Sequence, residues 1–469
     1  MPSVYDSHIL AKRLMEKLPY IPNQEQVELI ANLSQFCVEP ISNGYPVFVL
    51  NGYAGTGKTS LVGALVSALS SLNQKSVLLA PTGRAAKVFS EYSKHSAFTV
   101  HKKIYRQKKY SPDGGAGFTL APNKHTNTIF FVDEASMLPN TSTEGTVFGT
   151  GRLLDDLVEY VYSSSGCKLI LIGDDAQLPP VGLSRSPALD IEFLKSMGLD
   201  IYPFSLTTTS RQAADSGILY NATHIRTTMQ QEELPAASLI IDRFDDFRSL
   251  TGEYFIETLS DLYDSHGIEN SIIITRSNKR AVMFNTGIRS RILYREDELV
   301  AGDKILIAKN NYLWSESNEA LDFIANGDIA TVERVYSTES CFGFRFARTE
   351  LSFTESDVSI EAMVNLETLM SDSPTLSHER QQLLFNNVME TLSGSQRTRY
   401  ELLKQHPYFN ALQVKYAYAL TCHKAQGGQW DNVFIDMGYI PEEAYTSRDL
   451  YRWLYTAITR AKKRIYILK

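Results

Sequence analysis

The residues with the clearest chemical meaning lie at positions 52–59, GYAGTGKT, which fit the pattern G-x-x-x-x-G-K-[ST]. This segment follows the apolar run Pro46–Leu50 and precedes a helix-like run, Ser60–Leu72. In such a strand–loop–helix context, backbone N–H groups of the loop wrap phosphate groups at the N-terminus of the helix. A chance glycine-rich turn would rarely meet both conditions, so the pattern predicts a phosphate-binding loop.

We expect this loop and the first residues of its helix to bind ATP. Lys58 would reach the β- and γ-phosphates, and the Thr59 hydroxyl would ligate Mg²⁺. The predicted ATP-binding residues of the loop are Gly52, Ala54, Gly55, Thr56, Gly57, Lys58, Thr59 and Ser60.

Two later apolar runs end in acidic residues. Asp133 and Glu134 follow the run TIFFV, and Asp174 follows KLILIG. Downstream of a phosphate-binding loop, we expect Asp133 to hold Mg²⁺, usually through water, and Glu134 to act as the general base that polarises the attacking water. Gln177 would contact the γ-phosphate and report its loss.

Seven short apolar runs, separated by helix-sized stretches, set the fold class. Unbroken apolar runs are typical of strands buried on both faces of a parallel sheet, and their early and late groups predict two α/β domains. The runs are PVFVLNG, SVLLAP, TIFFVDE, KLILIGD, SIIITR, NVFIDM and RIYILK.

Three segments lack these unbroken apolar runs and predict other structures. The alternating stretch Gly302–Val335, with a turn at Asn326-Gly327, indicates a small antiparallel β module. The insertion Tyr105–Thr126 contains SPDGGAG and predicts a hairpin. Residues from about Glu361 to Gln405 are polar and helix-favouring, so we expect a helical insertion there.

The charge is unevenly distributed. The formal net charge is −7, yet Arg84–Lys109 carries eight basic residues against one acid, and Tyr451–Lys469 carries six basic residues and no acid. The stretch Arg226–Asn270 has ten acids against three bases. Basic stretches of this kind suit either a nucleic-acid partner or solvated surface, and charge alone does not decide between them.

Composition bounds the setting of the protein. The chain has 469 residues and 43% hydrophobic content, enough for two to four domains with their own cores. The apolar runs are strand-sized, so we expect no membrane span, and the N-terminus lacks the apolar core of a signal peptide. The four cysteines are far apart and show no metal-ligand spacing. A cytoplasmic protein with reduced thiols is therefore expected.

The ordered motifs GYAGTGKT, APTGRAAK, VDEASM, GDDAQLPPVG, TCHKAQG and YTAITRAK resemble those of superfamily 1 helicases. They look most like the RecD/Dda branch, the 5′→3′ subclass 1B, and the match runs from about Asn23 to Arg464. The resemblance implies two RecA-like P-loop domains, with ATP and Mg²⁺ as cofactors. Directionality rests on the resemblance alone.

The resemblance also implies roles for residues outside the loop. Gln26 aligns with the glutamine that reads adenine in this family. Arg211 and Arg460 match the two arginines that reach the γ-phosphate from the second motor domain, and Gly427 would lie near that phosphate in the closed state.

For nucleic acid, the resemblance implies contacts from both domains. Phe98 is open to two interpretations, a base-stacking aromatic or a core residue. We do not expect His423 to be a metal ligand, because no partner is spaced for it. The predicted DNA-binding residues are Pro81, Thr82, Gly83, Arg84, Phe98, Thr99, His101, Thr275, Asn278, Arg289, Thr421, His423 and Lys424.

The expected domains follow the motifs. Residues 1–205 would form the first RecA-like domain (1A), with 105–126 as a duplex-splitting pin. Residues 206–300 and 411–469 would form the second (2A), and 301–410 an SH3-like domain (2B) with the helical insertion.

The predicted function is an ATP-dependent 5′→3′ DNA helicase, in repair or recombination, acting on single-stranded DNA and on junctions of single- and double-stranded DNA. Because one chain holds both halves of the ATP site, a monomer suffices, and protein partners are possible. Alternatives are a DNA-stimulated ATPase that displaces proteins, the motor subunit of a nuclease complex, and an RNA-specific helicase.

Overall fold

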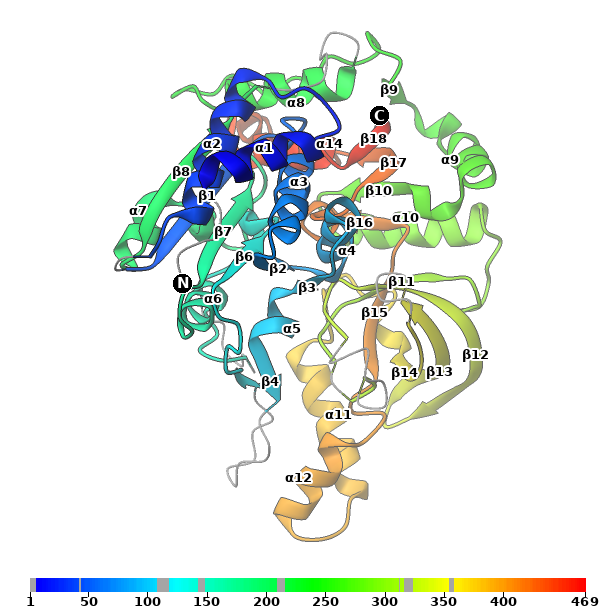
Figure 1. Cartoon of the computed structure of the whole chain (residues 1–469). Coiled ribbons are helices and arrows are strands. Elements are labelled where there is room, and N and C mark those ends of the chain that lie inside the picture. The colour runs from blue at the N-terminus through cyan, green and yellow to red at the C-terminus, as the bar shows by residue number, and fades with distance from the viewer. Residues whose placement is uncertain are drawn as a thin grey trace. The chain divides into compact units, whose positions relative to one another are not determined.

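The computed structural model describes residues 6–41, 44–107, 118–141, 148–208, 216–311, 313–315, 324–353 and 358–469. The described chain forms two compact units. Unit 1 contains the described residues up to Ser238 together with Thr446–Thr459. Unit 2 contains the described residues of Leu239–Tyr445 and of Arg460–Lys469 (Figure 1).

Unit 1 is built on a parallel sheet of six strands. In spatial order the strands are β3 (Ala97–Thr99), β2 (Lys75–Ala80), β6 (Thr128–Val132), β7 (Lys168–Gly173), β1 (Pro46–Gly52) and β8 (Asp200–Leu206). The central strands β6 and β7 are buried along their whole length, and β1 is buried except at the half-buried Asn51, as expected for strands covered on both faces.

Helices of unit 1 carry apolar faces that contribute to its core. Leu10, Leu29 and Leu65 belong to a buried cluster that also includes strand residues such as Phe48 and Ile170. The helices are α1 (Ser7–Lys17), α2 (Gln24–Val38), α3 (Lys58–Ser71), α4 (Gly83–Ser93), α5 (Val100–Ile104), α6 (Leu153–Tyr162), α7 (Ile191–Ser196), α8 (Gly217–Thr228) and α14 (Arg448–Ile458).

The predicted hairpin is present at its base. Strands β4 (Tyr105–Gln107) and β5 (Phe118–Leu120) pair in antiparallel register. The Tyr105 hydroxyl donates a 2.6 Å hydrogen bond to the buried Asp156 carboxylate. The expected turn within 108–117 lies outside the described residues.

Unit 2 contains a second parallel sheet of five strands. Its spatial order is β16 (Ala419–Thr421), β10 (Ser271–Thr275), β17 (Trp430–Asp436), β18 (Ala461–Leu468) and β9 (Phe247–Leu250). The helices of this part are α9 (Gly252–His266), α10 (Asn278–Arg291) and the short α13 (Cys422–Ala425). All seven apolar runs in the sequence are therefore strands, and both expected α/β sheets are confirmed.

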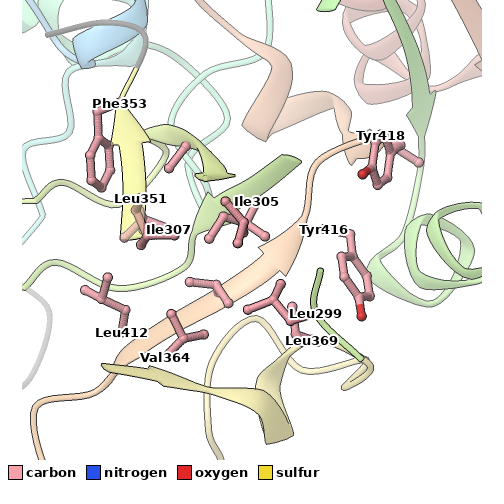
Figure 2. Close-up of a cluster of buried hydrophobic side chains, with 14 of the residues drawn as sticks. Leu299, Ile305, Ile307, Leu351, Phe353, Val364, Leu369, Leu412, Tyr416 and Tyr418 are labelled. Carbon is pink, nitrogen blue, oxygen red and sulfur yellow. The ribbon is translucent and has the colours of Figure 1, made fainter. Parts of the chain in front are cut away.

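The expected β module is a closed five-stranded barrel. Its strands are β11 (Lys304–Ile307), β12 (Ile329–Cys341), β13 (Phe344–Phe353), β14 (Val358–Asn365) and β15 (Leu412–Tyr416). Neighbouring strands are antiparallel except β14 and β15, which pair in parallel. Ile305, Leu351 and Leu412 fill its interior, within a cluster that continues to Phe434 of the sheet (Figure 2).

The helical insertion begins later than predicted. Residues 361–365 belong to β14, because alternating side chains there pair with β13. The helices are α11 (His378–Thr391) and α12 (Gln396–Lys404), which extend from the barrel in Figure 1. Leu384 and Val388 of α11 pack against Phe344 and Phe346 of β13.

Two further observations bear on the setting of the protein. No helix within the described ranges is long and apolar enough to cross a membrane. Cys37, Cys167, Cys341 and Cys422 are free thiols.

Candidate functional site

The phosphate-binding loop joins the carboxyl end of β1 to the amino end of α3. Gly57 caps the helix in the left-handed region (φ 84°), and no side chain occupies its cap position. A Cβ atom at Gly57 would lie 2.8 Å from both the Gln26 amide and the Tyr20 hydroxyl. Only glycine therefore fits there, and the free N–H groups of the first helical turn remain available to an anion.

Lys58 lies back along its own loop. Its amine donates to the carbonyl oxygens of Gly52 and, at 3.0 Å, of Tyr53. A Cβ atom at Gly52 would lie 2.7 Å from the Lys58 side chain, so glycine is required for this close approach. The ammonium group thus sits over the loop, where phosphates would bind.

Two acidic residues near Lys58 follow the strands β7 and β6, the first and second strands on one side of β1. Burial and the adjacent Glu134 raise the pKa of Asp133 to about 7, although the Lys58 charge opposes this. Burial likewise raises the pKa of Asp174 to about 6, with Lys58 again opposing. These two carboxyl groups, with the Thr59 hydroxyl in the first turn of α3, are the oxygen ligands that a hydrated Mg²⁺ ion prefers.

Glu134 has an unusual backbone conformation. It lies in the left-handed region (φ 51°, ψ 37°), and its N–H donates a 2.9 Å bond to the Asp133 carboxylate. Such a conformation costs a residue with a side chain roughly 1 kcal/mol and is found most often at functional sites. The backbone therefore holds this carboxylate in a fixed direction.

Sequence reasoning missed Tyr455, a residue of the YTAITRAK motif to which no role was given. The fully buried Tyr455 hydroxyl accepts a 2.8 Å bond from the Ala54 N–H and donates a 2.7 Å bond to Asp174. One helical residue later, the Thr456 hydroxyl accepts from the N–H of Leu178. Helix α14 is therefore hydrogen-bonded to the phosphate-binding loop and to the GDDAQLPP segment. Only the tertiary structure reveals this, although a buried tyrosine hydroxyl usually has a hydrogen-bond partner.

Gln26 has a structural function in this conformation. Its amide nitrogen donates to the Thr56 carbonyl at 2.9 Å, and its amide oxygen accepts from the N–H of Asn23 in a capping box. Gln26 is 1% exposed, so it fixes the loop from beneath. Its adenine-reading role remains a prediction.

The first predicted DNA-contacting loop follows β2 in the same sheet. Thr82 caps α4, accepting a hydrogen bond from the N–H of Ala85, and Pro81–Arg84 are half-buried. The N–H of Asp133 donates to the carbonyl of Leu79 at 2.9 Å, which ties the acidic pair to the end of β2. The loop is thus linked by one strand to the candidate catalytic residues.

Phe98, Thr99 and His101 lie at the edge of this sheet. Phe98 is 36% exposed, so it is not a core residue, and the Lys103 amine lies 5.3 Å from its ring centre. Thr99 caps α5. The His101 ring packs on Tyr105 and Phe148, and burial lowers its pKa to about 4, so it is neutral at physiological pH.

In unit 2, three predicted contacts line one small cavity of about 20 Å³. Asn278, Thr421 and Lys424 lie there together with Lys415, which sequence reasoning did not single out. His423, in the same segment, is exposed. No group of three or more metal-binding side chains occurs among the residues that the structure describes.

Two predicted DNA contacts, Thr275 and Arg289, have buried side chains with partners inside the protein, and their contact with DNA remains a prediction. Thr275 is fully buried, with its hydroxyl donating to the Ser277 carbonyl. Arg289 is 6% exposed, and two of its nitrogens, Nε and Nη2, are bonded to the Asp303 carboxylate at 3.0 Å. A buried arginine paired in this way supports the fold, and breaking the pair would leave a charge uncompensated.

Of the two predicted arginine fingers, only Arg460 lies among the described residues. Arg211 lies outside the described residues. Arg460 is 3% exposed and donates to the Gly428 carbonyl at 3.3 Å, directly beside the predicted Gly427. Gly427 has a positive φ of 73°. Unit 2 therefore brings these two predicted residues together.

Comparison with protein families divides the chain as the motifs do. A family described as an AAA domain matches residues 23–237, which include the phosphate-binding loop. The UvrD-like helicase C-terminal domain matches residues 416–468. The chain is thus similar to a P-loop AAA domain in its first half and to a UvrD-like helicase C-terminal domain near its end.

The relatives narrow this class. The ATP-dependent RecD2 DNA helicase of Deinococcus radiodurans is 25% identical over 437 residues, covering 90% of this chain and 47% of the relative. The ATP-dependent DNA helicase Dda of Enterobacteria phage T4 is 24% identical, covering 89% of this chain and 93% of the relative. The uncharacterized protein MJ1519 of Methanocaldococcus jannaschii is 24% identical, covering 96% of this chain and 38% of its own length.

The chain is accordingly similar in sequence to the RecD2 and Dda helicases. It spans less than half the length of two of these relatives, MJ1519 and RecD2. Among solved structures, the Pif1 helicase from Bacteroides in complex with ADP-AlF3 and ssDNA has a TM-score of 0.47 and 15% identity, covering 96% of this chain and 92% of that chain.

Proposed function

We propose that this chain is an ATP-driven motor that moves 5′→3′ on single-stranded DNA and separates duplex. One observation carries the proposal. The charge of Lys58 acts on both Asp133 and Asp174, which lie at the carboxyl ends of neighbouring parallel strands. Ligands of open α/β sheets bind at this edge.

The same edge supports coupling between nucleotide and DNA. The strands β1, β7, β6 and β2 are neighbours in that order, so the phosphate-binding loop and the Pro81–Arg84 loop are three strand spacings apart. At about 4.8 Å per spacing, that separation is about 14 Å. Loss of the γ-phosphate would move the backbone at Asp133. Because the Asp133 N–H is bonded to the Leu79 carbonyl of β2, this movement can be passed to the Pro81–Arg84 loop that follows β2.

The proposed chemistry uses residues of this chain in stated roles. Lys58 and the N–H groups of the loop hold the phosphates, and Thr59 with Asp133 holds the Mg²⁺ ion, which would neutralise charge on the phosphates. Glu134 polarises the attacking water. Gln177 senses the γ-phosphate, and Arg211 and Arg460 stabilise the charge of the transition state.

On the DNA side, we propose that Pro81–Arg84, Phe98, Thr99 and His101 contact the strand from unit 1. Asn278, Thr421, His423 and Lys424 contact it from unit 2. The N-terminus of α4 offers N–H groups to a phosphate, and the exposed Phe98 ring offers a stacking surface. The hairpin at β4–β5 would act as the pin. The domain boundaries 1–205, 206–300 with 411–469, and 301–410 are part of this proposal, as is a cytoplasmic site of action.

Strand separation tests the proposal. Partial duplexes with a 5′ or a 3′ single-stranded tail are incubated with Mg²⁺ and ATP, beside a Lys58→Ala control. Opening of the 5′-tailed substrate alone, abolished in the control, supports motor and polarity. Opening of the 3′-tailed substrate alone would retain the motor and refute the polarity. If neither opened while single-stranded DNA stimulated ATP hydrolysis, the chain would be a translocase or a partner-dependent subunit.

A further inference from the structure

Lys415 is a buried lysine without a carboxylate partner in hydrogen-bond distance among the described residues. It lies in β15 and is 7% exposed. Its amine donates a 2.5 Å bond to the main-chain carbonyl of Ser371. Lysine is almost never buried to this degree unless it is paired, so an additional reason for its position is required.

A second lysine faces the same small cavity. Lys424, in α13, is half-buried and lines the cavity of about 20 Å³ together with Lys415 and Asn278. Burial, and to a smaller extent the Lys424 charge, lower the pKa of Lys415 to about 8, and the exposed Asp372 opposes this shift. Burial also lowers the pKa of Lys424. Two partly desolvated ammonium groups therefore repel each other across the cavity.

An anion would resolve this repulsion. After its bond to Ser371, the Lys415 ammonium retains two N–H donors, and Lys424, Asn278 and Thr421 add further donors at the cavity. A cavity of about 20 Å³ holds one water-sized atom, the size of a single phosphate oxygen. The site therefore suits one non-bridging oxygen of a phosphodiester whose bulk remains outside.

The location favours a phosphodiester of a bound strand over a free anion. Asn278, Thr421 and Lys424 lie at the carboxyl ends of β10 and β16 and are already proposed to contact DNA. Lys415 lies behind them in the barrel strand β15, so it extends that surface inward. We propose that Lys415 is a phosphate-binding residue for single-stranded DNA, a contact that rests on the proposed function.

Salt dependence of binding provides the test. The affinity for a labelled oligo(dT) is measured across a salt series for the wild-type protein and for Lys415→Met, which keeps the apolar stem. Each phosphate contact on a single strand contributes about 0.7 to the slope of log K against log salt. We expect the slope of Lys415→Met to fall by about that amount, with several-fold weaker binding, and Lys415→Arg to restore it.

Lys304→Met is the matched control. Lys304 lies in the neighbouring strand β11, and its amine donates to the Thr331 hydroxyl at 2.8 Å. This variant should keep the wild-type slope. An unchanged slope and affinity in Lys415→Met would overturn the proposal. Failure of the wild-type protein to bind oligo(dT) would instead overturn the proposed function.

A measurement on the wild-type protein covers the case in which Lys415→Met does not fold. Amines are acetylated with and without oligo(dT), and each lysine is read by mass spectrometry. Oligo(dT) should protect Lys415 and Lys424, while Lys304 is modified equally in both samples. Equal modification of Lys415 would refute the contact. Protection by inorganic phosphate alone, at matched ionic strength, would identify a free-anion site and would also refute it.

Discussion

Glu134 has a strained backbone conformation next to the candidate Mg²⁺ ligand Asp133. The residue holds a left-handed conformation (φ 51°, ψ 37°) beside Asp133, at the end of β6. Neither property is visible in the sequence VDEAS, which shows only that two acidic residues end an apolar run. The structure adds that Glu134 has a left-handed backbone and that its N–H donates to the Asp133 carboxylate.

Replacing Glu134 by glutamine tests its role as general base. Glu134→Gln keeps the shape of the side chain and removes the proton acceptor, so ATP hydrolysis should fall by roughly 10²–10⁴-fold. Nucleotide binding, followed with a fluorescent ATP analogue, should persist. Glu159→Gln, at an exposed position of α6, is the control and should hydrolyse normally. Hydrolysis near the wild-type rate in Glu134→Gln would exclude Glu134 as the base.

His101 makes the stability of unit 1 sensitive to acid. Its pKa is about 4 in the folded protein and about 6.5 in the unfolded chain, because the ring is buried. Between these values the unfolded chain binds the proton first, so stability falls as the pH drops from about 6.5 to 4. At pH 5 the loss is about 2 kcal/mol.

The variant His101→Phe should remove this acid sensitivity, since phenylalanine suits the neighbouring rings of Tyr105 and Phe148. Denaturant unfolding at pH 7 and pH 5 measures the difference. The variant should lose about 2 kcal/mol less than the wild-type protein on acidification. His266→Phe, at an exposed position, should change nothing. An identical loss in wild type and His101→Phe would show that other groups govern the acid response.

Single side chains also show where prediction from sequence fails. The family resemblance implied that Arg289 contacts DNA, whereas in the structure it is bonded to Asp303, and its guanidinium lies 4.5 Å from the centre of the Tyr416 ring. A surface contact and a buried ion pair use the same residue type, and only tertiary partners distinguish them. For the same reason, Lys415 gave no signal in the sequence.

At the scale of helices and strands, local sequence patterns predicted the structure better than they predicted the contacts of single side chains. Most of the apolar runs form strands that are buried on both faces, whereas RIYILK in β18 alternates between buried and half-buried residues. The turn at Gly327 has the positive φ of 97° that a tight turn requires. The start of the helical insertion was predicted wrongly, because Glu361–Asn365 is the second half of strand β14, with its last four residues buried. Polar composition favoured a helix there, and pairing with β13 decided for a strand.

The hairpin is anchored by one buried carboxylate. Asp156, on α6, accepts hydrogen bonds from the Tyr105 hydroxyl, the Thr150 N–H and the Thr150 hydroxyl. Phe118 of β5 packs against Phe148 with a centroid distance of 4.8 Å. The two strands of the hairpin are thus fixed to the body of unit 1 from both sides.

Tyr105→Phe removes one of these anchors. If the hairpin splits duplex, strand separation should fall several-fold, whereas ATP hydrolysis stimulated by single-stranded DNA should persist. The two rates are measured in parallel on tailed duplex and on oligo(dT). Tyr162→Phe loses a comparable 2.6 Å hydroxyl bond, to the Pro46 carbonyl, away from the hairpin, and should unwind normally. Equal loss of both activities in Tyr105→Phe would assign the hairpin base a general structural role.

At the scale of the whole molecule, helix α14, near the end of the sequence, is hydrogen-bonded to segments of its first half. Helix α14 belongs to unit 1, whereas Arg460, two residues after it, belongs to unit 2. Through Tyr455, this helix is bonded to Ala54 and Asp174, which lie 401 and 281 positions earlier in the sequence. Arg460, a candidate arginine finger, therefore closely follows the helix that is hydrogen-bonded to the phosphate-binding loop.

Tyr455→Phe breaks this link without altering shape. The Ala54 N–H and the buried Asp174 carboxylate each lose a partner, which should cost about 1–3 kcal/mol in unfolding free energy and lower the rate of ATP hydrolysis. The matched control is Tyr451→Phe, one turn earlier in α14, which removes a 2.9 Å bond to the Pro235 carbonyl.

Unfolding in denaturant and ATP hydrolysis with saturating oligo(dT) are measured for both tyrosine variants. A loss of stability in both, with slower hydrolysis only in Tyr455→Phe, is expected, because Tyr455 alone of the two touches the loop. Equal hydrolysis in both variants would mean that the hydroxyl braces the helix and transmits nothing. That outcome would leave Arg460 to act without the connection through α14.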